Sequence, residues 1–392
     1  MDHPYKVILF ANTDWYLYNF RLPLAKALRS LGYDVILVSP PGSYADRLSR
    51  AGFRWVSFDF RRFGLNPISE LRTLVALMRL YRNERPDLVH HFTIKCVLYG
   101  SIAARIVGVR SVVNAVTGLG YVFVDERWQA RLMRPIVRVL YRLALGTSQV
   151  IFQNRDDQRR FREGRLVPDD QAHLVRGSGV DTSRFFPAEG RQTGEKRTVL
   201  FASRLLRAKG IYEFLAATAR LRVKFSNVEF CVAGDVELDN PDSVTTKTLD
   251  QWRSEGKVKC LGHRDDMDVF LRKVDVVVLP SYREGVPRIL VEAAASGLPL
   301  VATDVPGCRE IVRHGENGIL VPVKDIPALA GAMETLLRDD DLCRRMGEKS
   351  REIACAEFNI DRVILETFQV YAAAGADVSR PTKDIGRSAK FG

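Results

Sequence analysis

Short apolar runs alternate with amphipathic segments along the whole chain. Runs such as K-V-I-L-F (6–10) and V-V-V-L (276–279) are apolar without interruption, which is typical of strands buried on both faces of a parallel sheet. Segments such as 67–84 and 326–338 place apolar residues at three-to-four spacing, which predicts amphipathic helices. This alternation predicts an α/β fold with parallel sheets.

The alternation occurs twice, and 392 residues suffice for two domains. In the first array we expect strands at 6–10, 34–39, 55–58, 88–90, 111–115, 149–152 and 173–175, and helices near 19–30, 43–50, 67–84, 97–107, 127–146 and 155–163. In the second we expect strands at 198–203, 228–233, 258–261, 275–279, 299–302 and 319–321, and helices near 210–224, 243–254, 266–273, 287–296, 326–338 and 341–356. The pattern predicts two doubly wound, Rossmann-like domains at 1–185 and 190–359, joined by a linker rich in Gly, Pro and charge (183–196) and followed by a loose tail (377–392).

Two glutamates stand eight positions apart at one predicted strand-to-helix junction. Glu284 follows a strand, and Glu292 lies on the second turn of a helix that Pro287 is expected to begin. Ligands bind at the carboxyl edge of open α/β sheets, and the N–H groups of a helix start suit a phosphate. A carboxylate there can accept hydrogen bonds from a ribose diol. The alternative is a surface helix with two solvated glutamates.

A pair of cations occupies a similar junction about 80 residues earlier. Arg204 and Lys209 follow the strand-like run T-V-L-F-A-S (198–203) and precede an amphipathic helix. Two cations at the mouth of a parallel sheet can neutralise a diphosphate without a metal. The alternative is two solvated loop cations. Because both pairs lie on the same type of junction, we expect them to share one cleft.

These residues belong to a longer set of motifs. The second half of the chain resembles the donor-binding half of retaining glycosyltransferases of family 4, which have the GT-B fold. The motifs that carry this resemblance are S-R-x4-K-G, then G-D, then V-x-L-P-S-x3-E-G-x-P-x4-E-A-x3-G-x-P-L-V-A-T. The N-terminal segments L-Y-N-F-R-L-P-L-A-K-A-L, H-H-F-T-I-K and T-G-L-G-Y-V-F resemble a bacterial subgroup of that family. Its members add a hexose or N-acetylhexosamine to an undecaprenyl-diphosphate-linked sugar, for example GalNAc to diphospho-undecaprenyl bacillosamine.

The resemblance implies two doubly wound domains with a cleft between them and a last helix, about 360–374, that crosses back to the first domain. It implies a retaining hexosyltransferase that uses a UDP-sugar and needs neither metal nor other cofactor. The donor-side roles it implies are diphosphate binding by Arg204 and Lys209, sugar binding by Glu284, ribose binding by Glu292, support of phosphates or sugar by Gly285, Val286 and Pro287, and base recognition by Gly262 and His263.

The acceptor side is less closely defined by the resemblance. The candidates are His90, His91, Lys95 and Thr117. Many family members carry a histidine where this chain has Ala115-Val116-Thr117, so Thr117 or backbone groups would have to serve in its place. His90 and His91 end a predicted strand and are explained equally well as structural histidines.

The charge of the chain is concentrated in its first half. Residues 1–185 hold 28 Lys and Arg against 16 Asp and Glu, whereas residues 186–392 hold 31 of each. Such a basic half indicates an anionic partner or surface, and no zinc finger, helix-turn-helix or RRM signature points to nucleic acid. A basic amphipathic helix is predicted near 127–143, and the alternative is a core helix with a solvated arginine face. Its membrane-side candidates are Arg127, Trp128, Arg131, Arg134 and Arg138.

Targeting, redox and metal signals are weak. We expect no signal peptide and no membrane-spanning helix, six reduced cysteines, and a cytoplasmic protein bound peripherally to the inner face of the cell membrane. Asp266-Met267-Asp268 matches a metal-binding D-x-D pattern, but its place before a helix favours an N-cap. Two alternatives to a transferase share the fold: an enzyme like UDP-N-acetylglucosamine 2-epimerase, and a non-catalytic lipid-binding scaffold.

Overall fold

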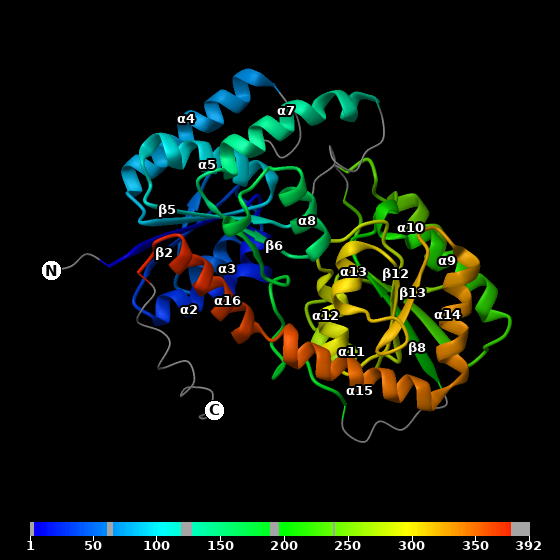
Figure 1. Ribbon diagram of the computed structural model, residues 1–392. Coiled ribbons are helices and arrows are strands. Elements are labelled where there is room, and N and C mark those ends of the chain that lie inside the picture. Colours follow the sequence, from blue (N-terminus) through cyan, green and yellow to red (C-terminus); the bar gives the residue numbers. More distant parts are fainter. Residues whose placement is uncertain (1–3, 61–65, 119–127, 189–195, 238–239, 378–392) are drawn as a thin grey trace. The chain divides into compact units, whose positions relative to one another are not determined.

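The computed structural model describes residues 4–60, 66–118, 128–188, 196–237 and 240–377. The chain divides into two compact units (Figure 1). Unit 1 consists of 1–178 and 363–392, and unit 2 of 179–362. The sequence placed this boundary near 185, but Val180 and Phe185 are buried in the core cluster of unit 2.

Unit 1 is built on a seven-stranded parallel sheet with the order β3-β2-β1-β4-β5-β6-β7. Its strands are β1 (Lys6–Phe10), β2 (Asp34–Ser39), β3 (Arg54–Ser57), β4 (Leu88–Phe92), β5 (Ser111–Val116), β6 (Gln149–Phe152) and β7 (Ala172–Leu174). The strand order reverses between β1 and β4, which defines a doubly wound sheet.

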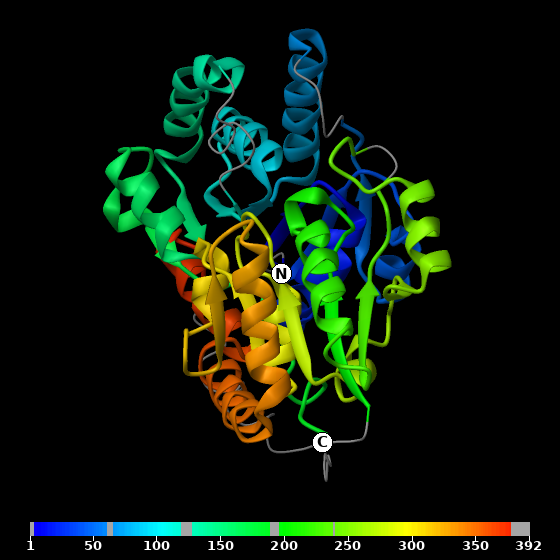
Figure 2. The same cartoon turned by 90° about the vertical axis from the view of Figure 1, so that its right-hand side faces the viewer.

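Helices cover both faces of this sheet. They are α1 (Asp14–Tyr16), the π-helix η1 (Leu17–Arg21), α2 (Leu22–Ser30), α3 (Ala45–Arg50), α4 (Pro67–Glu84), α5 (Ile94–Val107), α7 (Trp128–Leu145), α8 (Arg155–Glu163), the 3-10 turn η2 (Asp169–Gln171) and α16 (Ile360–Ala373). Helices α4, α5 and α7 lie on one face, and α2 and α16 on the other (Figures 1 and 2). From Val363 onward, α16 belongs to unit 1, where Tyr371 contacts His90 of β4.

Unit 2 repeats the architecture with six parallel strands in the order β10-β9-β8-β11-β12-β13. The strands are β8 (Arg197–Ala202), β9 (Val228–Ala233), β10 (Lys259–Gly262), β11 (Val276–Leu279), β12 (Leu300–Thr303) and β13 (Gly318–Val321). The helices are η3 (Arg207–Lys209), α9 (Ile211–Arg222), α10 (Thr246–Glu255), α11 (Met267–Leu271), α12 (Arg288–Ala295), α13 (Pro306–Ile311), α14 (Ile326–Arg338) and α15 (Asp340–Glu357).

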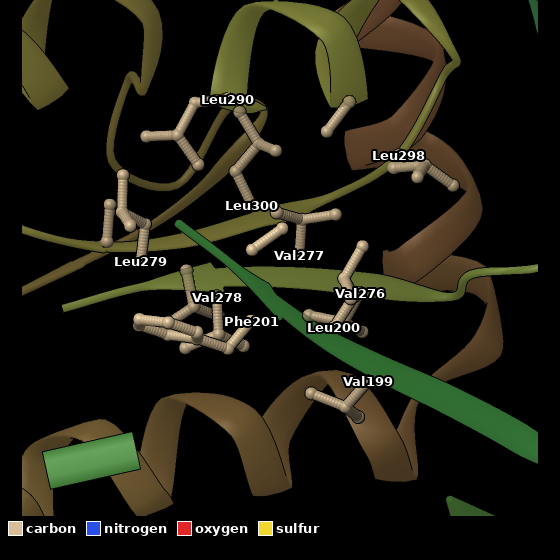
Figure 3. Packing of buried hydrophobic residues seen from close by; sticks show 14 of the residues in the cluster. Val199, Leu200, Phe201, Val276, Val277, Val278, Leu279, Leu290, Leu298 and Leu300 are labelled. Atoms are coloured by element: carbon tan, nitrogen blue, oxygen red, sulfur yellow. The ribbon is translucent and has the colours of Figure 1, made fainter. Parts of the chain in front are cut away.

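The core of unit 2 is centred on β8 and β11 (Figure 3). Val199, Leu200 and Phe201 of β8 are fully buried, as are all four residues of β11. They are buried on both sides because helices pack on both faces of the sheet, as their unbroken apolar pattern predicted. Burying each such side chain stabilises the fold by about 1.5–3 kcal/mol. A well-packed core of this kind holds the strand ends, and the loops after them, in fixed positions.

The expected doubly wound parallel sheets are confirmed, and the differences from the sequence prediction are local. Strand β4 continues two residues past His90, to Phe92. Pro287 is the N-cap of α12, which begins at Arg288 rather than at Pro287. The short helix α13 was not predicted, because six residues are too few for helical periodicity to be visible.

Candidate active site

In both units the strand order reverses beside the first strand, and ligands of open α/β sheets bind at that point, beyond the carboxyl ends of the strands. In unit 2 the reversal lies between β8 and β11. The loop after β8 carries Arg204 and Lys209, and the loop after β11 carries Glu284. The two junctions that the sequence marked separately are therefore neighbours in one unit.

Lys209 and Glu284 contact each other directly. Nζ of Lys209 lies 2.6 Å from Oε1 of Glu284, and the side chains are only 17% and 10% exposed. The Ser281 hydroxyl donates to the same oxygen at 2.7 Å. Lys209 is thus not the solvated loop cation that the sequence left open as an alternative. Cys308 is buried beside this pair, and burial followed by the negative charge of Glu284 raises the pKa of its thiol well above the usual range.

Two glycines let the backbone approach closely around this pair. A Cβ on Gly210, whose φ is +76°, would lie 2.0 Å from the carbonyl oxygen of Pro280. A Cβ on Gly307, on α13, would lie 2.2 Å from the carbonyl oxygen of Gly285. No side chain fits at either distance, so the loop after β11 is held between α13 and the turn that leads into α9.

Arg204 faces a different carboxylate. Its Nη1 lies 2.9 Å from Oε1 of Glu237, and its side chain is half exposed. An exposed pair of this kind is worth little in stability, about 0–1 kcal/mol. Arg204 is therefore accessible to an incoming anion that competes with Glu237.

Glu292 lies on the second turn of α12, as expected, and is 7% exposed. Nε of Arg288, one turn earlier, lies 2.5 Å from its Oε1. The helix begins after Gly285, Val286 and Pro287, and no side chain caps it. Its positive dipole end is therefore not covered by a side-chain cap, and the N–H groups of Leu290 and Val291 bond to the carbonyl oxygen of Pro287.

Gly262 and His263 lie at the end of β10, an edge strand of the sheet. Gly262 has a φ of +66° and accepts a hydrogen bond from the backbone N–H of Gly234, at the end of β9. The half-exposed imidazole of His263 lies 3.2 Å from Asp265. These residues belong to the same carboxyl edge as Arg204, two strands further out.

On unit 1, His90 and His91 are buried inside the fold rather than placed at a strand end, because β4 continues to Phe92. Nδ1 of His91 donates to Oδ1 of Asn114 at 2.8 Å, so Nε2 accepts from the Tyr81 hydroxyl at 2.9 Å. Burial lowers the pKa of His91 to about 4.

Nδ1 of His90 lies 2.7 Å from the Tyr371 hydroxyl. Burial, followed by the nearby charge of Arg21, lowers the pKa of His90 well below its usual range. Both rings are therefore buried and hydrogen-bonded within unit 1, which corrects their expected position at the end of the strand.

Lys95 and Thr117 line a cavity of about 310 Å³ in unit 1, which corresponds to the reversal point between β1 and β4. Among the described residues, its lining is Asn12, Phe60, Thr93, Ile94, Lys95, Thr117 and Gly118. Lys95 forms an ion pair with Glu70 of α4 at 2.7 Å. Thr93 has a φ of +72°, a strained value for a β-branched residue of the kind that clusters at functional sites.

The D-x-D pattern does not cap its helix by side chains. Asp266 is the N-cap residue of α11 but makes no capping hydrogen bond, because its carboxylate lies 2.5 Å from Arg264. Asp268 forms an ion pair with Arg184 at 2.8 Å. Within the described ranges, His, Cys, Asp and Glu side chains do not gather in threes as metal ligands do.

The membrane-side candidates lie on or beside α7. Arg127 lies outside the described residues, as do the side chains of Trp128, Arg131 and Arg134, although the backbone of these three forms part of the helix. Arg138 is exposed. In the described part of the chain, no helix has the length and apolar character needed to cross a bilayer.

Several residues of these sites were missed in the sequence. Ser281 stood inside a motif without an evident role, and Glu237 and Arg288 are surface-type residues whose partners only the structure reveals. Asn12 and Thr93 carried no signal, because neither a cavity nor a positive φ can be read from residue types.

Both halves of the chain match known families. Residues 6–154 match a family described as glycosyl transferase 4-like, and residues 183–353 match the glycosyl transferases group 1. With the two doubly wound sheets, these matches define the chain as a member of the GT-B glycosyltransferases. It is an enzyme of that class.

Within the class, the chain is similar to transferases that act on lipid-linked sugars. It is 27% identical over 350 residues (86% of this chain, 91% of the relative) to the N,N'-diacetylbacillosaminyl-diphospho-undecaprenol alpha-1,3-N-acetylgalactosaminyltransferase of Campylobacter jejuni. It is 28% identical over 305 residues (75% and 77%) to the UDP-Gal:alpha-D-GlcNAc-diphosphoundecaprenol alpha-1,3-galactosyltransferase of Escherichia coli. The crystal structure of Anabaena Alr3699/HepE in complex with UDP has the same fold, with a TM-score of 0.75 at 20% identity over 94% of this chain and 100% of that one.

Proposed function

We propose that the protein transfers a hexose or N-acetylhexosamine, with GalNAc the first choice, from a UDP-sugar to an undecaprenyl-diphosphate-linked saccharide. The reaction takes place at the cytoplasmic face of the cell membrane, in the assembly of a surface polysaccharide or a glycoprotein glycan. The two relatives named for lipid-diphosphate acceptors support this substrate class. The single observation that carries the proposal is the Lys209–Glu284 pair at the β8/β11 reversal point.

The donor site is assigned on unit 2. Lys209 and Arg204 bind the diphosphate, which competes with Glu284 and Glu237 for their charges. Glu284 uses Oε1 to hold Lys209 and Ser281, so its Oε2 is assigned to the hydroxyl groups of the donor sugar.

The remaining donor contacts follow from position on the same edge of the sheet. The uncapped start of α12 supports the phosphates or the sugar. Glu292 binds the ribose, and the backbone at Gly262-His263 binds the base. All of these groups belong to unit 2.

Transfer with retention needs no protein base. The bond between the anomeric carbon and the phosphate oxygen breaks, and a bond to the acceptor oxygen forms on the same face of the sugar. The departing phosphate oxygen takes the proton of the acceptor hydroxyl. Lys209 and Arg204 stabilise the negative charge that develops on the leaving UDP, so metal is not required.

The acceptor sugar is assigned to the unit 1 cavity lined by Asn12, Thr93, Lys95 and Thr117. Its Asn, Thr and Lys side chains offer the hydrogen-bonding groups that a saccharide requires. The anionic membrane partner is assigned to α7, whose Arg138 is exposed.

One assay tests the proposal against its alternatives. The protein is incubated with UDP-GalNAc, UDP-GlcNAc, UDP-Gal or UDP-Glc and an undecaprenyl-diphosphate-linked sugar, and donor and acceptor are analysed by mass spectrometry and NMR. Extension of the acceptor with an α-linked sugar supports the proposal. Epimerised donor without transfer identifies an epimerase, and unchanged substrates with bound lipid identify a scaffold.

A further inference from the structure

Helix α4 presents three large apolar side chains away from the sheet. Ile68 is 64% exposed, Leu71 62% and Val75 38%. Their spacing of three and four residues places them on one face of the helix. Single exposed apolar residues are common, but three in line along one helix form a stripe that is open to water at a free-energy cost.

The packing of α4 does not use this stripe. The opposite face is buried, where Leu77 and Tyr81 are at most 1% exposed and join the cluster formed with α5 and the sheet. The N-terminus is capped by Asn66, whose side chain accepts from the N–H of Ile68. The helix is thus anchored without the outer apolar groups, which are free for another role.

The charged side chains of α4 also differ between its buried and its exposed face. Its two carboxylates point into the protein, where Glu70 pairs with Lys95 and Glu84 with Arg54, each at 2.7 Å. The remaining charged side chains of the helix are three exposed arginines, Arg72, Arg79 and Arg82. They make no ion pair or side-chain hydrogen bond in the described part of the chain. Every exposed charge on α4 is therefore positive.

The stripe and the arginines share one side of the helix. With 3.6 residues per turn, these six side chains fall within an arc of about 100°. We call this set the α4 face: Ile68, Leu71, Arg72, Val75, Arg79 and Arg82. It combines groups that enter the apolar edge of a bilayer with groups that bind lipid phosphates.

We propose that the α4 face docks on an anionic lipid bilayer. Charge complementarity favours this occupant, because the half of the chain that contains α4 has 28 Lys and Arg against 16 Asp and Glu. A second copy of the chain would bring the same unpaired arginines against these, which is unfavourable. The inference rests on the proposed function for the lipid-linked acceptor, and it assigns a contact separate from α7.

Helix α4 lies in the same layer of unit 1 as α7. Helix α5 packs against both α4 and α7, so the three form a single layer on one face of the sheet (Figures 1 and 2). On α7, Val139 and Leu143 are each 52% exposed. Two helices of this layer thus carry exposed apolar side chains.

The test uses two variants of the full chain and two matched controls. The apolar variant is Ile68→Ser, Leu71→Ser, Val75→Ser, with Val223→Ser, Val269→Ser as its control, since both valines are exposed on unit 2. The basic variant is Arg72→Gln, Arg79→Gln, and its control Arg220→Gln, Arg222→Gln removes the same charge from exposed positions of α9. All four are expected to melt near the temperature of the wild type, because they alter exposed side chains.

Binding is measured by co-sedimentation with vesicles of phosphatidylglycerol and phosphatidylethanolamine at low and high salt. We expect the apolar variant to bind about tenfold or more weakly at both salts, and the basic variant to lose about tenfold at low salt only. The controls should bind like the wild type. Binding of both variants equal to that of their controls would overturn the proposal, as would a wild-type dimer in solution that the apolar variant abolishes.

A second readout separates this inference from the proposed function. Transfer is measured with a water-soluble, short-chain prenyl-diphosphate-linked sugar, for which membrane binding is not needed. Wild-type transfer in both variants, with weakened vesicle binding, supports the α4 face. If neither the wild type nor any variant transfers sugar, but the two variants bind vesicles more weakly than their controls, the proposed function is wrong and the proposal for the α4 face is still supported.

Discussion

Lys209 and Glu284 are 75 residues apart in the chain and form an ion pair of 2.6 Å in unit 2. The pair joins the loop after β8 to the loop after β11 at the point where the strand order reverses. It holds a cation in a fixed position at the site proposed for the diphosphate of the donor.

The first prediction concerns this pair. Lys209→Ala should lower kcat by about 10²–10³, because a charge directed at the leaving diphosphate is lost. It should also destabilise unit 2 by about 1–3 kcal/mol, because Glu284 is only 10% exposed and loses its cation. Lys209→Ala with Glu284→Gln should regain much of the stability but not the activity, as measured by urea unfolding and steady-state kinetics. Near-normal turnover of the single variant would remove Lys209 from the leaving-group role.

The second prediction concerns the backbone around Glu284. Gly307→Ala places a methyl group 2.2 Å from the carbonyl oxygen of Gly285, so the loop must shift and the KM for UDP-sugar should rise about tenfold or more. Gly331→Ala on α14 is the matched control, since nothing lies within 4 Å of its Cβ, and it should leave the kinetics unchanged. Equal KM values in the two variants would mean that the loop tolerates displacement.

The third prediction concerns metal. Transfer should continue in EDTA, because two side-chain cations and the start of α12 supply the positive charge. Asp266→Asn should behave like the wild type in the same assay, since its carboxylate pairs with Arg264. Loss of activity in EDTA that Mg²⁺ or Mn²⁺ restores would instead assign the D-x-D pattern to a metal.

The fourth prediction concerns pH. The pKa of His91 in the folded state is about 4, below the ordinary value of 6.5, and that of His90 is lowered as well. The unfolded chain therefore binds more protons between these values, so stability falls as pH drops from about 6.5 towards 4, by up to about 1.4 kcal/mol per pH unit for each histidine.

Urea unfolding at pH 7.5 and pH 5 measures this slope. His91→Gln should be less stable at both pH values, because Tyr81 and Asn114 lose a well-fitted partner, but its pH dependence should be shallower than that of the wild type. Parallel slopes for the two proteins would show that His91 titrates normally in the folded state.

The fifth prediction concerns α7. Changing Arg131, Arg134 and Arg138 together to glutamine should weaken binding to anionic vesicles by about two orders of magnitude if all three face lipid, because each basic residue near the surface is worth about 1 kcal/mol. Affinity for free UDP should not change, since the assigned nucleotide site belongs to unit 2. Vesicle binding is measured by sedimentation and UDP binding by titration. Loss of both kinds of binding would mean that α7 is needed for the fold.

Much of the fold could be predicted from local sequence. The run V-V-V-L of β11 has no polar face, so it fits only the inside of a parallel sheet, and Gly210 marks a turn that no other residue enters without strain. Helix α13 could not be predicted, because six residues are too few to show a helical period. The extension of β4 could not be predicted either, because the residue types of His91 and Phe92 do not show where a strand ends.

Local sequence was enough to predict the two doubly wound domains, the strand-to-helix junctions and the residue types at their edges, because periodicity and turn chemistry are local properties. Tertiary structure alone decided that Lys209 pairs with Glu284, that His90 and His91 are buried between Tyr371, Tyr81 and Asn114, and that the acidic side chains of α4 turn inward while its arginines stay exposed. Such pairings depend on strand order and on which helix packs on which face, and these are set by the burial of the whole core rather than by any one segment.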